Sequence, residues 1–315
     1  MMDKQGLAAS KTPGVQASGA VGIIGVGNMG GAIAQNLLKL GWRVGVNDID
    51  PLKTQPLAQI GAQVVSTPSE LANFCETIII AVVDANQVSD VLGIVGVNRG
   101  LLISLSTLNT VMLCPTIAPK DVIRFAQAIE GTGASVIDAP MSGGPLRAQQ
   151  GRMSLMTACS RSVWERHEKL LTALANPVFF ISERIGDGAK TKLINNLLAG
   201  INLVASAELL SMAEKVGLDP KTTLDVIESS SGQSWAGSER MRRALTGDPR
   251  DLPPLAHMTL LEKDTRIALE MGLESGYSGP LGASAVKTFK DASASGLAHC
   301  DDAAMLYFLR HFKDL

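Results

Sequence analysis

Residues 21–48, VGIIGVGNMGGAIAQNLLKLGWRVGVND, decide the fold of the chain. Val21–Gly25 is a short apolar run, glycines follow at positions 27 and 30, and a helical pattern comes after them. Arg43–Val46 is a second short apolar run, and it leads to Asp48. The order strand, glycine turn, helix, strand and acid predicts the first βαβ unit of a dinucleotide-binding domain.

Each glycine of this turn has its own physical role. Gly25 makes the tight turn, Gly27 lets a pyrophosphate approach the backbone, and Gly30 lets the helix pack closely on the strand. Asn28 and Met29 open the helix, whose free N–H groups and positive dipole end would face the phosphates. We therefore expect these five residues to bind the cofactor.

Asp48 indicates which dinucleotide is bound. It lies 18 positions after Gly30, where a carboxylate can accept hydrogen bonds from both ribose hydroxyls and would repel a 2′-phosphate. The segment Asn47–Asp50 has no arginine that could hold such a phosphate. These features favour NAD over NADP. The alternative reading is that Asp48 only caps the turn before Pro51.

Short apolar runs continue to alternate with helical patterns beyond this unit. The expected strands are Gln63–Val65, Thr77–Val83, Leu101–Leu105, Val136–Asp138, Ser154–Ala158 and Phe179–Ser182. The expected helices are Pro51–Gln59, Ser69–Phe74, Gln87–Leu92, Pro115–Glu130 and Arg161–Ala175. Such alternation predicts an α/β fold with a parallel-rich sheet covered on both faces.

Strand signals vanish after Lys190, and only helical patterns follow. They comprise a long helix at about 188–216 and the segments Asp219–Glu228, Ser234–Leu245, Leu260–Met271 and Pro280–Ala294. We expect a Rossmann-type domain over residues 21–183 and an all-α domain over residues 184–315, joined by the long helix. Residues 1–20 are rich in Gly, Ala and Ser, which predicts a disordered tail.

The long helix carries an unusual polar face. Its apolar residues spread around most of the circumference, which predicts burial on more than one side. Lys192, Asn195 and Asn196 are spaced i, i+3 and i+4, so they share one face near its start. This face is either an exposed first turn with a cap network or a functional site.

A second glycine-containing loop follows the expected strand that ends at Asp138. Ser142, Gly143 and Gly144 could present a hydroxyl and backbone N–H groups to an anion, although two glycines also suit an ordinary turn. Arg147, nearby, could reach a second carboxylate or could simply be solvated.

Composition excludes several classes of function. The 315-residue chain has 28 Lys and Arg against 30 Asp and Glu, a net charge of −2, and no basic run that would indicate nucleic acid. Its four cysteines form no CxxC pair, which suits a reducing, cytoplasmic compartment. The run His299–Asp302 contains ligand-type residues, but adjacent positions seldom converge on one metal ion. We expect no membrane-spanning segment, because the sequence lacks an 18-residue apolar run.

The motifs together resemble the β-hydroxyacid dehydrogenase family, from about Val21 to beyond Met305. They are Gly-Val-Gly-Asn-Met-Gly at 25–30, Ser-Thr at 106–107, Asp-Ala-Pro-Met-Ser-Gly-Gly at 138–144, Gly-x-Gly-x-x-x-Lys-x-x-Asn-Asn at 186–196 and Lys-Asp at 263–264. The resemblance implies that Lys192 is the catalytic lysine, that Asn196 orients the substrate, and that Ser142, Gly143 and Gly144 hold its carboxylate. It also implies that the cofactor is lined by Val82, Val83, Thr107 and Lys263.

The sequence departs from the family pattern in two places. Val82-Val83-Asp84 replaces a proline-containing turn, and Ser104-Leu-Ser-Thr107 replaces Asp-Met-Ser-Thr. The stretch Gly232–Trp235 resembles the Gly-Asn-Ser-Trp of threonate-type members, which favours a polar C3–C4 hydroxy acid. Trp235 could equally belong to the core.

The expected function is an NAD-dependent oxidoreductase that transfers a hydride between nicotinamide and the alcohol of a small 3-hydroxy acid, of 3-hydroxyisobutyrate or threonate type. Lys192 would be the general acid/base, with its pKa lowered from about 10.4 toward neutrality by burial and positive charge, although a purely positioning role stays open. The alternatives are an imine or semialdehyde reductase and a non-catalytic dinucleotide-sensing module. 6-Phosphogluconate dehydrogenase has His-Asn where this chain has Asn195-Asn196. The resemblance also implies a homodimer or homotetramer.

Overall fold

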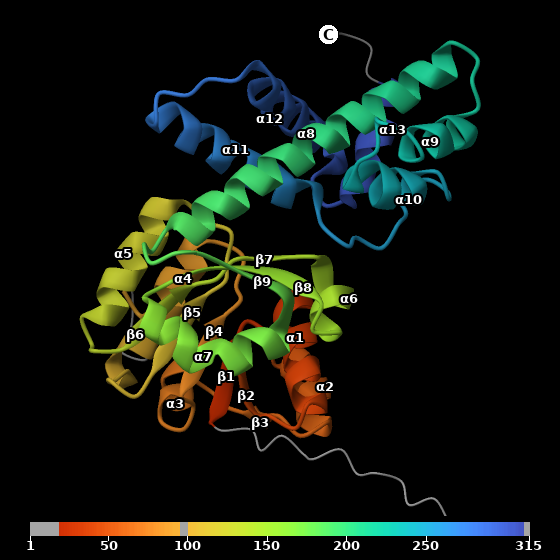
Figure 1. Cartoon of the computed structure of the whole chain (residues 1–315). Coiled ribbons are helices and arrows are strands. Elements are labelled where there is room, and N and C mark those ends of the chain that lie inside the picture. The colour runs from red at the N-terminus through yellow and green to blue at the C-terminus, as the bar shows by residue number, and fades with distance from the viewer. Residues whose placement is uncertain (1–18, 95–99, 312–315) are drawn as a thin grey trace, which may run out of the picture.

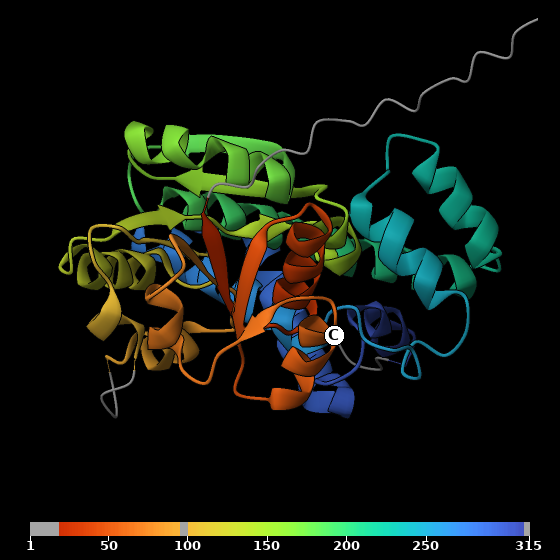
Figure 2. The ribbon, with the colours of Figure 1, turned by 90° about the horizontal axis from the view of Figure 1, so that it is seen from below.

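The computed structural model describes residues 19–94 and 100–311, so most of the expected N-terminal tail lies outside the described residues. An α/β part built on one sheet is joined by the long helix α8 to an all-helical part, as Figure 1 shows. This arrangement confirms the fold class expected from the sequence. Figure 2, seen from below, shows helices on both sides of the sheet.

The sheet has the strand order β3-β2-β1-β4-β5-β6-β8-β7, with β9 paired to β8. Strands β1 to β6 run parallel to one another, β8 is antiparallel to β6 and β7, and β9 is parallel to β8. Their bounds are β1 Ala20–Ile24, β2 Arg43–Asn47, β3 Gln63–Val64, β4 Thr77–Ile80, β5 Thr110–Leu113, β6 Ser135–Asp138, β7 Met141–Ser142, β8 Met153–Ala158 and β9 Ala175–Ser182.

Helices cover both faces because successive strand residues point to opposite sides. Ile79 packs into the core beneath α1 and α7, whereas its neighbours Ile78 and Ile80 pack into the core beneath α3, α4 and α5. The bounds are α1 Asn28–Lys39, α2 Pro51–Gln59, α3 Pro68–Ala72, α4 Ala85–Leu92, α5 Pro119–Glu130, α6 Gly144–Gln149 and α7 Arg161–Leu174. Near-continuous apolar strands are typical of a sheet buried on both faces.

The strand expected at Leu101–Leu105 is wrong. Residues Leu101–Ser104 form a 3₁₀ turn in which Ile103 is 69% exposed, and the fifth strand is Thr110–Leu113. All four residues of that strand are buried. Both runs are apolar, so their composition does not distinguish them, and the buried run is the one that forms the central strand. The helix expected from Pro115 begins at Pro119 instead.

The helical part is organised around α8, Asp187–Lys215, which Figure 1 shows running from the edge of the α/β part through the helical part. Leu203 and Leu210, from the C-terminal half of α8, pack in one core with Phe289 and Leu306. The other elements are α9 Pro220–Glu228, a π-helical segment Ala236–Met241, α10 Arg242–Ala244, α11 Met258–Glu274, α12 Pro280–Ala292, a second π-helical segment Ser293–Leu297, a 3₁₀ turn Asp302–Ala304 and α13 Met305–His311.

One side of α8 is not covered within this chain, which differs from the burial expected on several sides. The exposed apolar residues are Ile194, Leu198, Leu209, Met212 and Val216. Their spacings of 4, 11, 3 and 4 place them on one stripe along the helix. We call these five residues the α8 stripe.

By length and composition alone, α8 could cross a membrane. A single such helix is weak evidence, because core helices of soluble proteins pass the same test. Here α8 contacts β8 and β9 near its start and α11, α12 and α13 along its length.

Candidate active site

The glycine loop after β1 has the geometry that close approach of a ligand requires. A Cβ on Gly30 would lie 1.9 Å from the carbonyl oxygen of Gly25, so α1 touches the loop at that point. A Cβ on Gly27 would meet nothing within 4 Å, which leaves open space before the helix. No side chain caps the N-terminus of α1, and Asn28 is exposed there with Met29 beside it. The loop therefore fits a pyrophosphate on the helix N-terminus.

Asp48 performs the structural role that the sequence left open. Its Oδ2 accepts a hydrogen bond from the backbone N–H of Val26 at 2.8 Å, and its Oδ1 accepts one from Asp50 at 2.9 Å. The carboxylate thus fixes the glycine loop against the end of β2. Each oxygen has a second lone pair, so these bonds leave room for ribose hydroxyls.

The prediction for Thr107 is contradicted by its place in the fold. The register pairs Thr77 with Thr110 at the amino ends of β4 and β5, and Thr107 precedes that edge. The glycine loop lies at the opposite, carboxyl edge, where open α/β sheets bind ligands. The threonine after the carboxyl end of β5 is Thr116, which the sequence analysis missed. The sequence offered a second apolar run, Thr110–Leu113, before Cys114-Pro115-Thr116, with Pro119 opening the next helix.

Val82 and Val83 follow β4 at the carboxyl edge, because the strand ends at Ile80 and not at Val83 as expected. Val82 is half-buried, and Val83 is 56% exposed. Lys263, from α11, reaches the same edge, since its Nζ donates to the carbonyl oxygens of Val83 at 2.9 Å and Thr116 at 2.7 Å. Lys263 Nζ also lies 3.2 Å from Oδ1 of Asp264. The ammonium therefore donates two hydrogen bonds to backbone carbonyl oxygens and is ion-paired with Asp264.

The second glycine loop begins at the end of β7. Gly143 and Gly144 have φ values of +128° and +73°, which side chains rarely adopt, and α6 starts at Gly144. Ser142 is half-buried, and its hydroxyl makes no side-chain hydrogen bond among the residues that the structure describes. The stem of Arg147 lies against Gly143. Within residues 19–94 and 100–311, the guanidinium of Arg147 makes no ion pair.

Asp138 ties the start of α8 to the sheet. It is fully buried, and its Oδ2 accepts hydrogen bonds from the backbone N–H groups of Gly186 at 2.9 Å and Ala189 at 3.1 Å. A Cβ on Gly188 would lie 2.8 Å from the carbonyl oxygen of Met156. Burial raises the pKa of Asp138 to about 6, although the N–H groups oppose this shift. This contact explains the Gly-x-Gly spacing and fixes the helix that carries Lys192.

Lys192 and Asn196 lie on the buried side of α8, with exposed fractions of 6% and 8%, whereas Asn195 is exposed. Asn196 Nδ2 donates to Asp264 Oδ2 at 2.7 Å. The Lys192 ammonium itself has no hydrogen bond or ion pair with any residue that the structure describes. Burial lowers the pKa of Lys192 to about 8, and the charge of Asp264 partly offsets that effect. An exposed cap network is therefore not what this face forms.

Asp264 is a site residue whose contacts the sequence analysis did not foresee. It is only 3% exposed, and its Oδ1 has no hydrogen-bond partner among the described residues. The contact with Asn196 spans 68 positions of the chain. A carboxylate at such a separation cannot be assigned to a helix face by spacing rules.

The run His299–Asp302 forms no metal site among the residues that the structure describes. Asp302 is paired with Arg240 at 2.8 Å, and Asp301 lies 3.5 Å from Arg243. His257 Nδ1 bonds with the carbonyl oxygen of His299. These groups belong to the framework of the helical part.

Known families match both parts of the chain. The family described as the NAD binding domain of 6-phosphogluconate dehydrogenase matches residues 20–182. The family described as NAD-binding of NADP-dependent 3-hydroxyisobutyrate dehydrogenase matches residues 186–309. L-threonate dehydrogenase from Cupriavidus necator is 33% identical over 286 residues, which cover 91% of this chain and 94% of that protein.

Two solved structures have the same fold over nearly the whole chain. One is 3-hydroxyisobutyrate dehydrogenase from Salmonella typhimurium, with a TM-score of 0.84 and 30% identity. The other is Psf3 in complex with NADP+ and 2-OPP, with a TM-score of 0.84 and 27% identity. Each comparison covers 92% of this chain and 100% of the other.

These relatives confirm the expected enzyme class and do not favour an imine reductase or a non-catalytic sensor. The cofactor is NAD, with NADP possible. The chain belongs to the β-hydroxyacid dehydrogenase family and is an oxidoreductase that acts on CH–OH donors.

Proposed function

We propose that the chain oxidises the alcohol of a small polar 3-hydroxy acid of threonate type, with Lys192 as the general acid/base. The observation that carries this proposal is the burial of Lys192 beside Asn196, with no hydrogen bond or ion pair to its ammonium among the described residues. A buried, unpaired amine is costly for a structural residue and is suited to exchange a proton with a ligand.

The lowered pKa of Lys192, about 8, suits that task. A base acts best when its pKa lies near the working pH, and an unperturbed lysine is almost fully protonated there. A bound nicotinamide supplies the hydride acceptor for oxidation and the hydride donor for reduction. In oxidation Lys192 takes the hydroxyl proton, and in reduction it returns that proton to the developing alkoxide.

The loop Ser142–Gly144 is proposed to bind the substrate carboxylate. Its hydroxyl and backbone N–H groups are donors, and donors of this kind form anion-binding nests. Asn196 would then orient the substrate hydroxyl through its amide while Asp264 holds that amide in place. Arg147 is available beside the loop for a distal polar group.

The cofactor is proposed to be bound by Gly25, Gly27, Asn28, Met29 and Gly30. Asp48 would hold the adenosine ribose and favour NAD over NADP. Val82, Val83 and Thr116 would line the carboxyl edge, with Thr116 in place of Thr107. We place the boundary between the two domains at 183–184, between the end of β9 and the start of α8.

A substrate comparison tests this proposal. We expect kcat/KM for L-threonate to exceed that for 3-hydroxyisobutyrate at least about tenfold, because unmatched polar groups in a site are costly. NAD+ should be preferred to NADP+ for the reason given for Asp48. The measurement is NADH absorbance in steady state with each acid and each cofactor. A preference for 3-hydroxyisobutyrate would refute the assignment to a polar acid.

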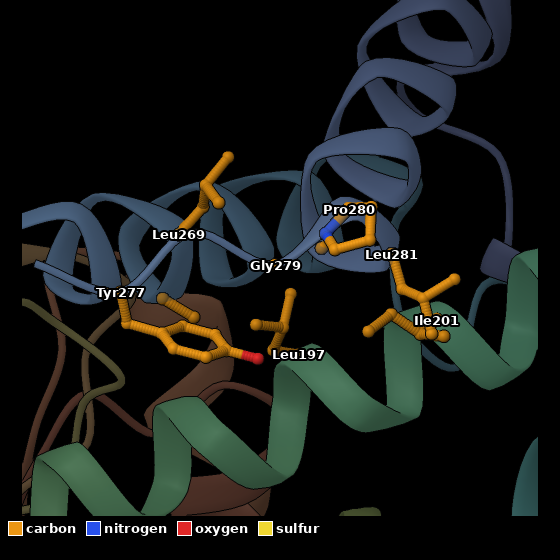
Figure 3. A pocket seen from close by; sticks show the side chains of 10 residues that line it. Leu197, Ile201, Leu269, Tyr277, Gly279, Pro280 and Leu281 are labelled. Carbon is orange, nitrogen blue, oxygen red and sulfur yellow. The ribbon is translucent and has the colours of Figure 1, made fainter.

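The chain is also proposed to act in the cytoplasm as a homodimer or homotetramer, without a nucleic-acid or membrane partner. The α8 stripe supports association, since exposed apolar residues gathered on one helix face mark interaction surfaces. An apolar pocket of about 260 Å³ lies between α8, α11 and α12. Figure 3 shows Leu197 and Ile201 of α8 facing Tyr277 and Pro280 across this pocket. None of the proposed site residues lines it.

Charge on the stripe should break the assembly. We expect Leu198→Glu to reduce the solution mass to that of one chain, because a buried, unpaired carboxylate is strongly unfavourable at an interface. Ile60→Glu is the matched control, since Ile60 is similarly exposed, at 53%, but lies on the α/β part. The measurement is mass by light scattering after size-exclusion chromatography. An oligomer that survives Leu198→Glu unchanged would mean that the stripe is not the interface.

A further inference from the structure

A chain of buried contacts connects the face of α8 that carries Lys192 to α11. Asn196 Nδ2 lies 2.7 Å from Asp264 Oδ2, and Asp264 is 3% exposed. The second oxygen, Oδ1, has no hydrogen-bond partner among the described residues. Its charge is balanced by the ammonium of Lys263, 3.2 Å away, but the oxygen keeps a lone pair that no hydrogen bond from a described residue satisfies.

Lys263 fixes this carboxylate relative to the sheet. Its Nζ donates to the carbonyl oxygens of Val83 and Thr116, which follow β4 and β5, and lies 3.2 Å from Asp264 Oδ1. These contacts span 180 and 147 positions of the chain. Because Lys263 and Asp264 are adjacent, the position of the carboxylate is set by the strand ends proposed to line the cofactor.

We propose that Asp264 is a positioning residue that orients Asn196 and sets the charge on Lys192, and that Lys263 is the strut that couples both to the cofactor edge. The proposal deepens the proposed function and rests on it. The family resemblance implied that Lys263 lines the cofactor. In this proposal Lys263 acts through protein contacts and does not need to touch the cofactor.

Of the charged groups near Lys192, Asp264 is the one whose charge affects the pKa of the lysine. Asp187, on α8 itself, is engaged by Ser182, Arg184 and Lys190. Asp138, on β6, is directed at the backbone N–H groups of the helix start. From α11, the charge of Asp264 stabilises the ammonium. Burial and Asp264 thus act in opposite directions on the pKa of Lys192.

Two substitutions should therefore move the protonation of Lys192 in opposite directions. Asp264→Asn removes the stabilising charge, so we expect the midpoint of Lys192 to fall by about 1 pH unit or more. Lys263→Met removes the cation that is paired with Asp264 at 3.2 Å, so more of the carboxylate charge acts on Lys192 and we expect the midpoint to rise. Loss of packing alone has no reason to give opposite signs.

The measurement is the pH dependence of Lys192 acetylation by acetic anhydride, quantified by mass spectrometry. It needs no substrate, so it is independent of turnover and distinguishes failure of the coupling from failure of the proposed function. The rising limb of kcat/KM against pH is the second readout. Asp264→Glu and Lys263→Arg should return the midpoint toward that of the wild type.

Lys120→Met is the matched control. Lys120, on α5, forms an exposed ion pair with Glu274 of α11 at 2.8 Å, so it also joins the two parts of the chain but is not in the site. We expect the Lys192 midpoint to stay unchanged in this variant. Unchanged midpoints in both Asp264→Asn and Lys263→Met, or shifts of the same sign, would overturn the proposal even if turnover fell.

Discussion

Lys192→Met is expected to lower kcat about 10²–10⁴-fold, the range that general acid–base catalysis contributes. Methionine keeps most of the apolar stem of the side chain, so the packing of this buried position should survive. The affinity for NADH should stay within about twofold, because the residues proposed to bind the pyrophosphate and the ribose lie on other elements. The measurements are steady-state turnover and a fluorescence titration with NADH.

Lys190 provides the control for this variant. It lies two positions earlier on α8, is exposed, and is paired with Asp187 at 2.8 Å. Asp187 keeps hydrogen bonds from Ser182 and Arg184 when Lys190 is removed, so Lys190→Met should retain wild-type turnover. Equal turnover in Lys192→Met and wild type would remove Lys192 from the chemistry and leave it a positioning role.

Alanine substitutions at two glycines of the first loop are expected to affect different properties of the protein. In Gly30→Ala the new methyl would lie 1.9 Å from the carbonyl oxygen of Gly25. The backbone must shift to admit it, and we expect a loss of about 3 kcal/mol or more in the free energy of unfolding. In Gly27→Ala the methyl meets nothing within 4 Å, so stability should change by less than about 1 kcal/mol.

For NADH binding, in contrast to stability, we expect a large effect of the substitution at Gly27. The space before the helix is where a pyrophosphate would approach the backbone, so Gly27→Ala should weaken NADH binding at least about tenfold while the chain stays folded. Urea unfolding and NADH titration of the two variants separate stability from binding. Full NADH affinity in Gly27→Ala would show that the cofactor does not occupy this loop.

Much of the site follows from short-range sequence rules. The βαβ unit is local, so the glycine spacing and Asp48 are enough to predict the loop. Lys192 and Asn196 are four residues apart on a helix, and helical geometry alone places them on one face. The sequence could not show that Asn195 faces solvent, because which side of α8 is covered depends on α11.

The errors share one physical cause. Two apolar runs, Leu101–Leu105 and Thr110–Leu113, both precede a threonine, and only tertiary burial decides which becomes the strand. Choosing the wrong run placed the threonine expected to line the cofactor at position 107, whereas the threonine proposed from the fold is at position 116. Contacts such as Lys263 with Val83 and Asn196 with Asp264 join distant segments, so propensity and periodicity carry no information about them.

The α8 stripe is a different case. The sequence predicts that the long helix is buried on more than one side, yet a single chain leaves the apolar residues of the stripe exposed. Hydrophobic periodicity indicates that a helix face is covered but does not say whether the cover is intramolecular or a second copy.

Transfer of deuterium from substrate to cofactor is the most direct test of the central claim. The enzyme is mixed with NAD+ and with L-threonate or 3-hydroxyisobutyrate deuterated at C3, the carbon that carries the 3-hydroxyl. The NADH formed is analysed by mass spectrometry. We predict NADH that carries one deuterium, in an amount that falls with Lys192→Met. Tight NADH binding with no labelled NADH from any 3-hydroxy acid would contradict the assignment as a hydroxyacid dehydrogenase.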